Sequence, residues 1–89
     1  MNEKDNVAVA LTDLAAGEVV MVRMGEVLRE ARAVENVPRG HKIALTNIKK
    51  GEPIIKYGEV IGLASRTIME GSHVHIHNVV GQQSKETRK

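Results

Sequence analysis

A short pattern that recurs along this chain limits what it can fold into. Residues 10–18 and 44–52 each hold a Thr, an aliphatic residue two positions later and a Gly three positions after that, and residues 66–72 hold a weaker copy. The aliphatic side chain can enter a core, while the Gly adopts the positive φ that ends a one-turn helix. The Gly residues of successive copies stand 34 and 20 positions apart, which is too uneven for a regular solenoid. We therefore expect one turn type, reused between strands that leave and re-enter a single core.

The apolar composition favours sheets over helices. Twelve Val and seven Ile stand against five Leu, and Phe and Trp are absent. β-Branched side chains are stiff and pack well on pleated strands. We therefore predict an all-β domain of short strands joined by single-turn helical connections. The 89 residues fit one domain. We place it at residues 1–80, followed at 81–89 by a mobile polar tail without apolar periodicity.

Seven apolar stretches are predicted as strands. They cover residues 7–11, 18–23, 27–34, 41–45, 53–57, 60–64 and 73–80. The third stretch also fits a short helix, but the flanking Gly25 and Pro38 favour a strand. Gly62 is expected to kink or thin the sixth strand.

Composition also argues against several classes of protein. No apolar run is long enough to cross a membrane, and the polar start of the chain lacks the apolar stretch of a signal peptide. The absence of Cys excludes disulfides and thiolate metal sites and is compatible with the cytoplasm. The net charge of +2 equals the charge of the tail, so the body is nearly neutral, and Tyr57 is the one aromatic residue. A nucleic-acid partner is therefore not expected.

The last predicted strand carries the pattern that is richest in chemistry. His73, His75 and His77 alternate with apolar residues, so in a strand their imidazoles share one face while Val74 and Ile76 take the other. Two His at positions i and i+2 can chelate a metal ion through neutral ring nitrogens, and His75 and His77 are the candidate pair. The same alternation also fits a half-buried edge strand with solvated histidines. Because three of the four His lie within five residues, a role in metal binding, carboxylate binding or proton transfer is favoured.

Two further places are candidates for binding an anion. His41 and Lys42 follow a Pro-Arg-Gly turn that could present an imidazole and an ammonium together. Lys56 and Tyr57 precede Gly58 and could bind a carboxylate. The alternatives are a solvated strand start for the first pair and, for the second, a Tyr that covers the core rim beside a solvated Lys. No Gly-rich phosphate loop, nucleophilic Ser elbow or carboxylate pair completes a catalytic set.

Four ordered blocks of this sequence resemble one enzyme family. They are Asp5-Asn6-Val7-Ala8-Val9-Ala10-Leu11, Gly40-His41-Lys42-x-Ala44-Leu45, Lys56-Tyr57-Gly58-x-x-Ile61-Gly62 and Gly71-x-His73-Val74-His75-x-His77-Asn78. Together they resemble the N-terminal domain of altronate dehydratase. Galactarate dehydratase and the small subunit of sulfolactate sulfo-lyase are related to it. The resemblance runs from about residue 5 to residue 79.

The resemblance implies an SAF-type β-clip fold and a role in a lyase. The chain would be the small subunit, or the N-terminal domain, of a metal-dependent hydro-lyase that dehydrates a sugar acid such as altronate. Its implied partner is a much larger catalytic subunit, and the small chain would be inactive alone. The implied cofactor is a divalent metal, iron in this family, bound mainly by the large subunit.

The resemblance also implies roles for the polar residues of these blocks at a shared cleft. The residues implied to serve catalysis are His73, His75, His77 and Asn78. The residues implied to bind substrate are His41, Lys42, Lys56 and Tyr57.

Other functions of the same fold stay open as alternatives. The chain could be the small subunit of sulfolactate sulfo-lyase, although the Asp-Asn-Val-Ala-Val-Ala-Leu block favours altronate dehydratase. It could also be a non-enzymatic SAF module of the binding or antifreeze-like type, which would not need its histidines. An assembly chaperone of the flagellar type shares the fold but would be expected to carry a signal peptide. A second copy of the chain is a further candidate partner.

Overall fold

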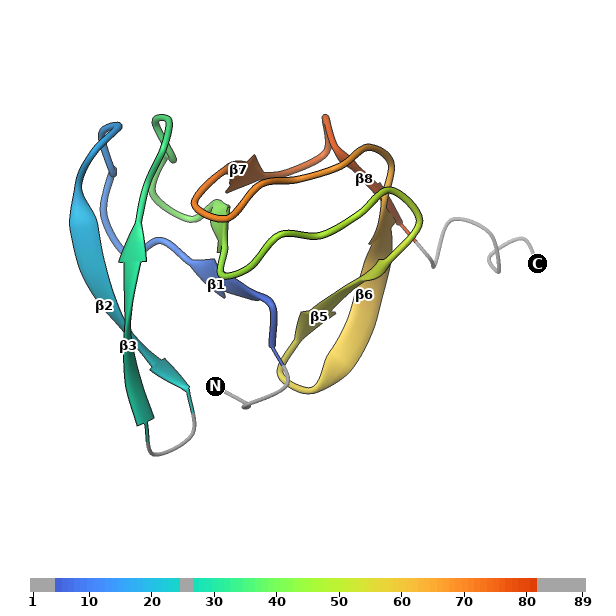
Figure 1. Cartoon of the computed structure of the whole chain (residues 1–89), viewed down its shortest axis with the longest axis horizontal. Helices are drawn as coiled ribbons and strands as arrows, with labels where there is room; N and C mark the ends of the chain where they lie inside the picture. The colour runs from blue at the N-terminus through green and yellow to red at the C-terminus, as the bar shows by residue number, and fades with distance from the viewer. Residues whose placement is uncertain (1–4, 25–26, 82–89) are drawn as a thin grey trace.

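The computed structural model describes residues 5–24 and 27–81, and all regular structure in these ranges is β-strand (Figure 1). The strands are β1 (Val7–Val9), β2 (Val19–Met24), β3 (Val27–Arg32), β4 (Lys42–Ala44), β5 (Pro53–Lys56), β6 (Glu59–Ala64), β7 (His73–Val74) and β8 (Val79–Gly81). Within the described ranges no helix is long and apolar enough to span a membrane. The prediction of an all-β fold is confirmed.

The strands form three small antiparallel sheets. The central sheet has the order β1-β4-β7. A hairpin of β2 and β3 lies on one side of it, and a sheet of order β5-β6-β8 lies on the other (Figure 1). No described strand is longer than six residues. Short strands in small sheets are consistent with the β-clip that the resemblance implies.

Four copies of the turn pattern, one more than the sequence suggested, connect these strands. Each copy begins with a buried Ala, has a buried aliphatic residue four positions later and ends in a Gly with φ between 86° and 93°. The copies are residues 10–17, 33–40, 44–51 and 64–71. The second copy escaped prediction because it contains no Thr. The first two copies contact each other as one turn pair, and the last two form another.

Reciprocal backbone hydrogen bonds hold each turn pair together. In the first pair the Gly17 amide donates to the Ala33 carbonyl at 2.6 Å, and the Gly40 amide donates to the Ala10 carbonyl at 2.8 Å. The second pair repeats both bonds at equivalent positions, each at 2.8 Å. The buried aliphatic residues face each other in isolated bridges, Leu14 with Val37 and Ile48 with Ile68. The two halves of the fold are thus built on the same scheme.

Each turn pair is the centre of its own hydrophobic cluster, and the central sheet separates the two. Ala8 of β1 and Ile43 of β4 point into the first cluster, with Leu14 and Val37. Their neighbours along the strands, Val7 and Ala44, point into the second cluster. Alternation of side chains along β1 and β4 therefore supplies both cores at once. The prediction of a single core is wrong, because the structure has two smaller hydrophobic clusters.

Three structural predictions from sequence have definite outcomes. The third stretch is a strand, as favoured. The single-turn helices are wrong, because each aliphatic residue is held extended by its bridge to the partner turn. The strand predicted at 73–80 is also wrong, because β7 ends at Val74, residues 75–78 form a turn and β8 starts at Val79. Ile76, expected on a buried face, lies in this turn and is 84% exposed.

Two other predictions concern Gly62 and the tail. The pairing of β5 with β6 shifts register beside Gly62, which fits the predicted kink. β8 extends to Gly81, the first residue of the predicted tail, and the remainder, 82–89, lies outside the described residues.

The turn glycines give a matched stability test. Gly51 and Gly71 share a φ near 90°, but an added Cβ at Gly51 meets nothing, whereas at Gly71 it collides with the Arg32 carbonyl oxygen and lies 3.1 Å from a Val34 methyl group. We expect Gly51→Ala to lower the free energy of unfolding by about 1–2 kcal/mol, the cost of a left-handed conformation. Gly71→Ala should cost more. Urea unfolding of both variants checks this, and equal losses would contradict the packing described at Gly71.

Candidate functional site

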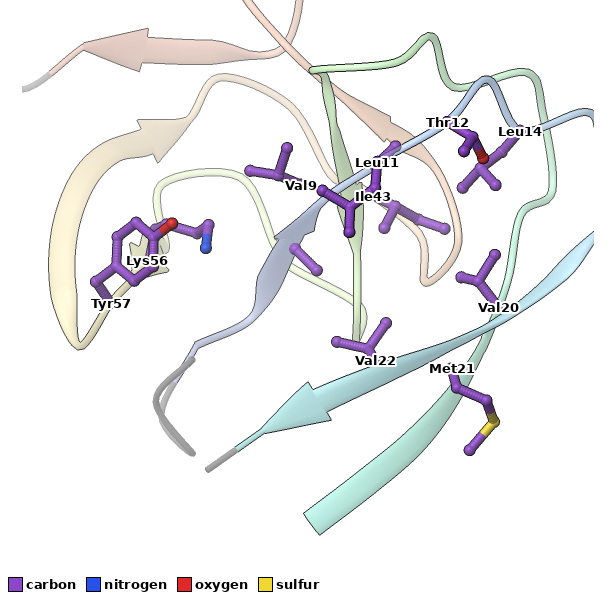
Figure 2. Close-up of a pocket in the computed structure, with 12 residues that line it drawn as sticks. Val9, Leu11, Thr12, Leu14, Val20, Met21, Val22, Ile43, Lys56 and Tyr57 are labelled. Carbon is purple, nitrogen blue, oxygen red and sulfur yellow. The ribbon is translucent and has the colours of Figure 1, made fainter. Parts of the chain in front are cut away.

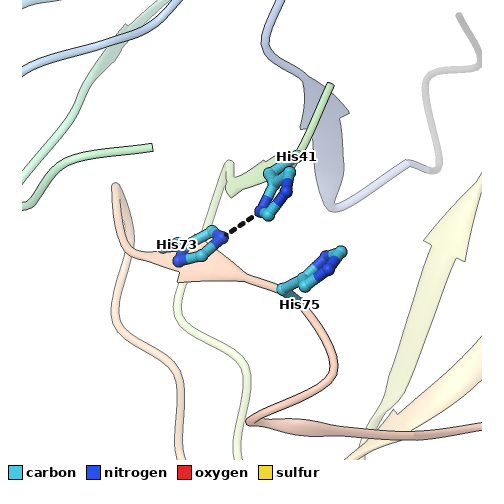
Figure 3. A group of neighbouring side chains, drawn as sticks. All are labelled: His41, His73 and His75. Atoms are coloured by element: carbon cyan, nitrogen blue, oxygen red, sulfur yellow. Dashed lines mark hydrogen bonds between the residues drawn. The ribbon is translucent and has the colours of Figure 1, made fainter. Parts of the chain in front are cut away.

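All four histidines of the chain gather beside the central sheet, and three of them are shown in Figure 3. The Nδ1 atom of His41 lies 2.7 Å from the Nε2 atom of His73. The His41 ring also stacks on that of His75, with centroids 3.8 Å apart and planes at 16°. The His77 ring centroid lies 4.9 Å from that of His73. These four residues are called the histidine cluster below.

Strand pairing and a turn bring the four histidines together. The sequence had instead predicted that alternation along one strand would place three of them on one face. β4 and β7 are antiparallel, with Ile43 opposite His73. Continuing this register places His41, just before β4, opposite His75, just after β7. The turn at 75–78 then carries His77 back toward His73. His41 thus belongs to the centre of the cluster, although it is 32 residues away from His73 in sequence.

Glu35 is a member of the site that the sequence did not reveal. Its Oε2 atom accepts a hydrogen bond from the His73 backbone amide at 3.0 Å. The preceding residue, Val34, donates its backbone amide to the Gly71 carbonyl at 3.0 Å. Glu35 lies in the second copy of the turn pattern, so recognising that copy in the sequence would have drawn attention to it.

Asn78 fixes the turn that carries the last two histidines. Its side chain is buried, with 5% exposure. The Oδ1 atom accepts from the His75 amide at 2.9 Å, and the Nδ2 group donates to the His73 carbonyl at 2.8 Å. The Asn78 amide donates in turn to the His75 carbonyl at 3.0 Å. An Asn side chain that bonds to nearby backbone offers an alternative to a sheet ladder, which explains why the strand stops here.

Two histidines of the cluster, His73 and His75, are held toward the neutral form. Desolvation by burial is the main cause that lowers the pKa of His73 below its ordinary value, and the three neighbouring imidazoles lower it further, while the Glu35 carboxylate opposes them. Desolvation also leads the causes that lower the pKa of His75, followed by the surrounding imidazoles and the Lys42 ammonium. Neutral imidazoles can accept a proton or bind a metal ion.

The donor set of the cluster fits a divalent transition metal. His41, His73 and His75 each offer a ring nitrogen, and these atoms lie within 4.8 Å of one another. Imidazole suits iron and zinc, and three protein ligands leave a coordination position open for a substrate. The pair predicted from sequence, His75 and His77, shares only His75 with this group. The three-histidine set spans two strands, which spacing along one strand could not indicate.

The other predicted binding residues are divided between two surfaces. Lys42 starts β4 and is close enough to act on the His75 charge. Lys56 and Tyr57 line a groove of about 370 Å³ between β1 and β2 (Figure 2). Lys56 is buried, and its Nζ atom lies 3.6 Å from the centroid of the exposed Tyr57 ring. No histidine lines this groove.

The first block of the resemblance holds the Lys56–Tyr57 turn in shape. Tyr57 and Gly58 have φ values of 55° and 77°, as a tight two-residue hairpin requires. Asp5 Oδ1 accepts from the Gly58 amide at 2.8 Å, and Asn6 Oδ1 accepts from the Ile55 amide at 2.7 Å. These contacts give Asp5 and Asn6 a structural role.

Comparison with known proteins agrees with the sequence blocks. The family model of the altronate/galactarate dehydratase SAF domain matches residues 1–82. Altronate dehydratase of Escherichia coli (strain K12) is 53% identical over 74 residues, which cover 83% of this chain and 14% of that protein. Altronate dehydratase of Bacillus subtilis (strain 168) is 41% identical over 78 residues, which cover 88% of this chain and 15% of that protein. The chain therefore spans about one seventh of the length of these curated relatives.

A relative of another activity covers a smaller part of the chain. Subunit alpha of (2R)-sulfolactate sulfo-lyase from Paracoccus pantotrophus is 46% identical over 46 residues. The match covers 52% of this chain and 69% of that subunit. Relatives of this domain therefore occur both as a small part of a longer enzyme and as a short subunit.

Replacing Asn78 should loosen the turn of the cluster. Asn78→Ala leaves the His75 amide and the His73 carbonyl without their partner, so we expect a loss of about 1–3 kcal/mol in the free energy of unfolding. Asn78→Asp keeps the acceptor for His75 and should lose less. Urea unfolding and hydrogen exchange of the His75 amide measure both effects. An Ala variant with unchanged stability and exchange would contradict this role.

The metal-free protein should lose stability in mild acid. The lowered pKa values of His73 and His75 mean that the unfolded chain binds more protons than the folded one as pH falls below about 6.5, so the free energy of unfolding decreases there and is fully recovered above it. Urea unfolding between pH 5.5 and 8 checks the slope. In the double variant His73→Asn, His75→Asn the slope should flatten. A slope that persists unchanged would place its origin elsewhere.

Proposed function

Because this chain belongs to the altronate/galactarate dehydratase SAF-domain family, we propose that it supplies its histidine cluster to a lyase active site that a larger domain or subunit completes. The observation that carries this proposal is the convergence of all four histidines on one another from two strands and a turn. A relative that is itself an enzyme subunit supports the existence of a partner. Relatives of which the match covers only about one seventh support a larger catalytic part.

The proposed reaction is dehydration of a sugar acid such as altronate, the class named by the longer relatives. A base removes the proton on the carbon α to the carboxylate, and that C–H electron pair forms the new double bond. The hydroxyl group on the β carbon leaves as water after it is protonated. The resulting enol then tautomerises to a 2-keto acid. Burial lowers the pKa of His73 and of His75, so both imidazoles are neutral at pH 7, the form that binds a metal ion.

We assign distinct roles to the residues of the site. His77 is the candidate for proton transfer, His41, His73 and His75 are the candidate metal ligands, and Asn78 holds the turn that carries His75 and His77. Lys42 is the better candidate for binding the substrate carboxylate, since it stands beside His75, whereas His41 is assigned to the metal. Lys56 and Tyr57 are the weaker ones because no histidine lines their groove.

A divalent metal, iron in our proposal, would complete the chemistry. When bound, such an ion stabilises the negative charge that develops on the enediolate. His41, His73 and His75 are the residues that would hold it on this chain, and the larger partner would supply the remaining ligands. We also propose a cytoplasmic location, since the longer relatives carry the names of sugar-acid dehydratases.

A second candidate function is that of the small subunit of a sulfolactate sulfo-lyase. Its support is the relative in which the match covers 69% of a subunit that is itself shorter than this chain. The elimination has the same course, with sulfite leaving from the β carbon in place of water. Assays with both substrates distinguish the two candidate functions. A sulfo-lyase releases sulfite from sulfolactate, whereas a dehydratase forms a keto acid from altronate.

The test is reconstitution with the catalytic lyase chain of the same organism. We expect no dehydration of altronate by the 89-residue chain alone, activity with the partner, and at least about a 100-fold lower kcat for His77→Asn, in the range of a lost acid–base group. His73→Asn and His75→Asn should lose activity through the metal site. The exposed variant Lys50→Ala is the control and should retain the wild-type kcat. Full activity of the isolated chain would refute the need for a partner.

The His variants must also be shown to bind the partner. If His75→Asn forms the complex and turns over at the wild-type rate, the histidine cluster has no catalytic role. Titration of the isolated chain with Co²⁺, followed by its visible absorption, tests the metal separately. If the isolated chain does not bind Co²⁺, or if His41→Asn leaves the binding unchanged, the metal site is assigned to the partner.

A further inference from the structure

We propose that a groove beside Ile76 is where the larger catalytic part of the lyase docks, an inference that rests on the proposed function. Ile76 stands between two histidines of the cluster, in the turn at 75–78, and is 84% exposed. Turns favour small polar residues at such positions. A large aliphatic side chain that points to solvent from the turn of a functional cluster is therefore a candidate contact for another surface.

The groove next to this side chain is apolar and adjoins the cluster. It has a volume of about 230 Å³ and is lined mainly by aliphatic side chains, among them Ile61, Val74 and Val79. Its lining also includes His75 and Lys42, so the groove and the histidine cluster share a wall. A partner that closes over the cluster would cover this groove as well.

The open side of the histidine cluster indicates which molecule occupies the groove. His41, His73 and His75 are only partly buried, so the site has no wall on its open side. The chain spans about one seventh of its longer relatives, so most of such an enzyme lies outside it. We infer that the partner inserts an aliphatic or aromatic side chain beside Ile76. A central apolar anchor of this kind carries a large share of the binding energy at many interfaces.

The groove between β1 and β2 is the competing surface (Figure 2). It is larger, and Leu11 on its edge is 83% exposed. It does not adjoin the cluster, because no histidine lines it. A partner seated there would leave the histidines open to water. Leu11 is thus a matched control for Ile76, with the same side-chain chemistry and the same exposure.

The experiment compares Ile76→Asp with Leu11→Asp in binding to the catalytic lyase chain of the same organism, by isothermal titration calorimetry. Both residues are exposed, so both variants should fold, which circular dichroism checks. We expect Kd to rise at least 10-fold for Ile76→Asp and less than 2-fold for Leu11→Asp. The reverse order, or equal effects, would overturn the proposal. Loss of self-association of the isolated chain in Ile76→Asp, with partner binding intact, would assign the groove to a second copy and also overturn it.

Activity at saturating partner separates this inference from the proposed function. Ile76→Asp should recover the wild-type kcat once enough partner is present, because it changes affinity and not chemistry. His75→Asn should not recover. If Ile76→Asp weakens binding while the His variants keep full activity, docking at the groove stands and the catalytic role of the cluster falls.

Discussion

Two pairs of turns, each joined by a glycine amide that donates to an alanine carbonyl of its partner turn, hold this small fold together. Each glycine has a φ near 90°, which ends the turn and aims the amide across to the neighbouring copy. The aliphatic residue of each turn is thereby placed at the centre of a cluster. The chain has no Phe or Trp, so many small side chains must do the packing, and the reciprocal bonds fix where they meet.

The position of the histidine cluster depends on these turns. His41 comes directly after Gly40 of the first turn pair, and His73 comes two residues after Gly71 of the second. Pairing of β4 with β7 then brings the two exits side by side. Arg29 of the β2–β3 hairpin binds the Leu45 carbonyl and makes an ion pair with Glu70, which further ties the halves together. The site thus lies at the seam between two similar halves and uses residues from both.

The sequence could predict features set by neighbouring residues, such as the turns and their buried side chains. It could not predict contacts between distant parts of the chain. Leu14, Ile48 and Ile68 were recognised as core residues because the repeated pattern places them before a glycine, and all three are buried. The partnership of His41 with His73 depends on which strands pair, and that is decided by both cores together. The four sequence blocks identified the family, but spacing alone assigned the metal pair within one strand.

The failure at residues 73–80 has a definite physical cause. Alternation of histidines with Val and Ile is a strand pattern, but the buried Asn78 side chain bonds to the backbone of His73 and His75 and closes a turn. A strand would have hidden Ile76 and spread the imidazoles along one face. The turn instead stacks His75 on His41 and leaves Ile76 exposed.

This turn links the chemistry of the site to its proposed closure. A domain of this size hides only roughly 60–65% of its unfolded surface, so it has little material with which to wall in a reaction site. The cluster remains partly exposed, although burial already lowers the pKa of His73 and His75. A partner anchored at Ile76 would exclude more water from the same imidazoles. Docking and closure of the histidine cluster would then be one event, because one turn presents both Ile76 and two of the histidines.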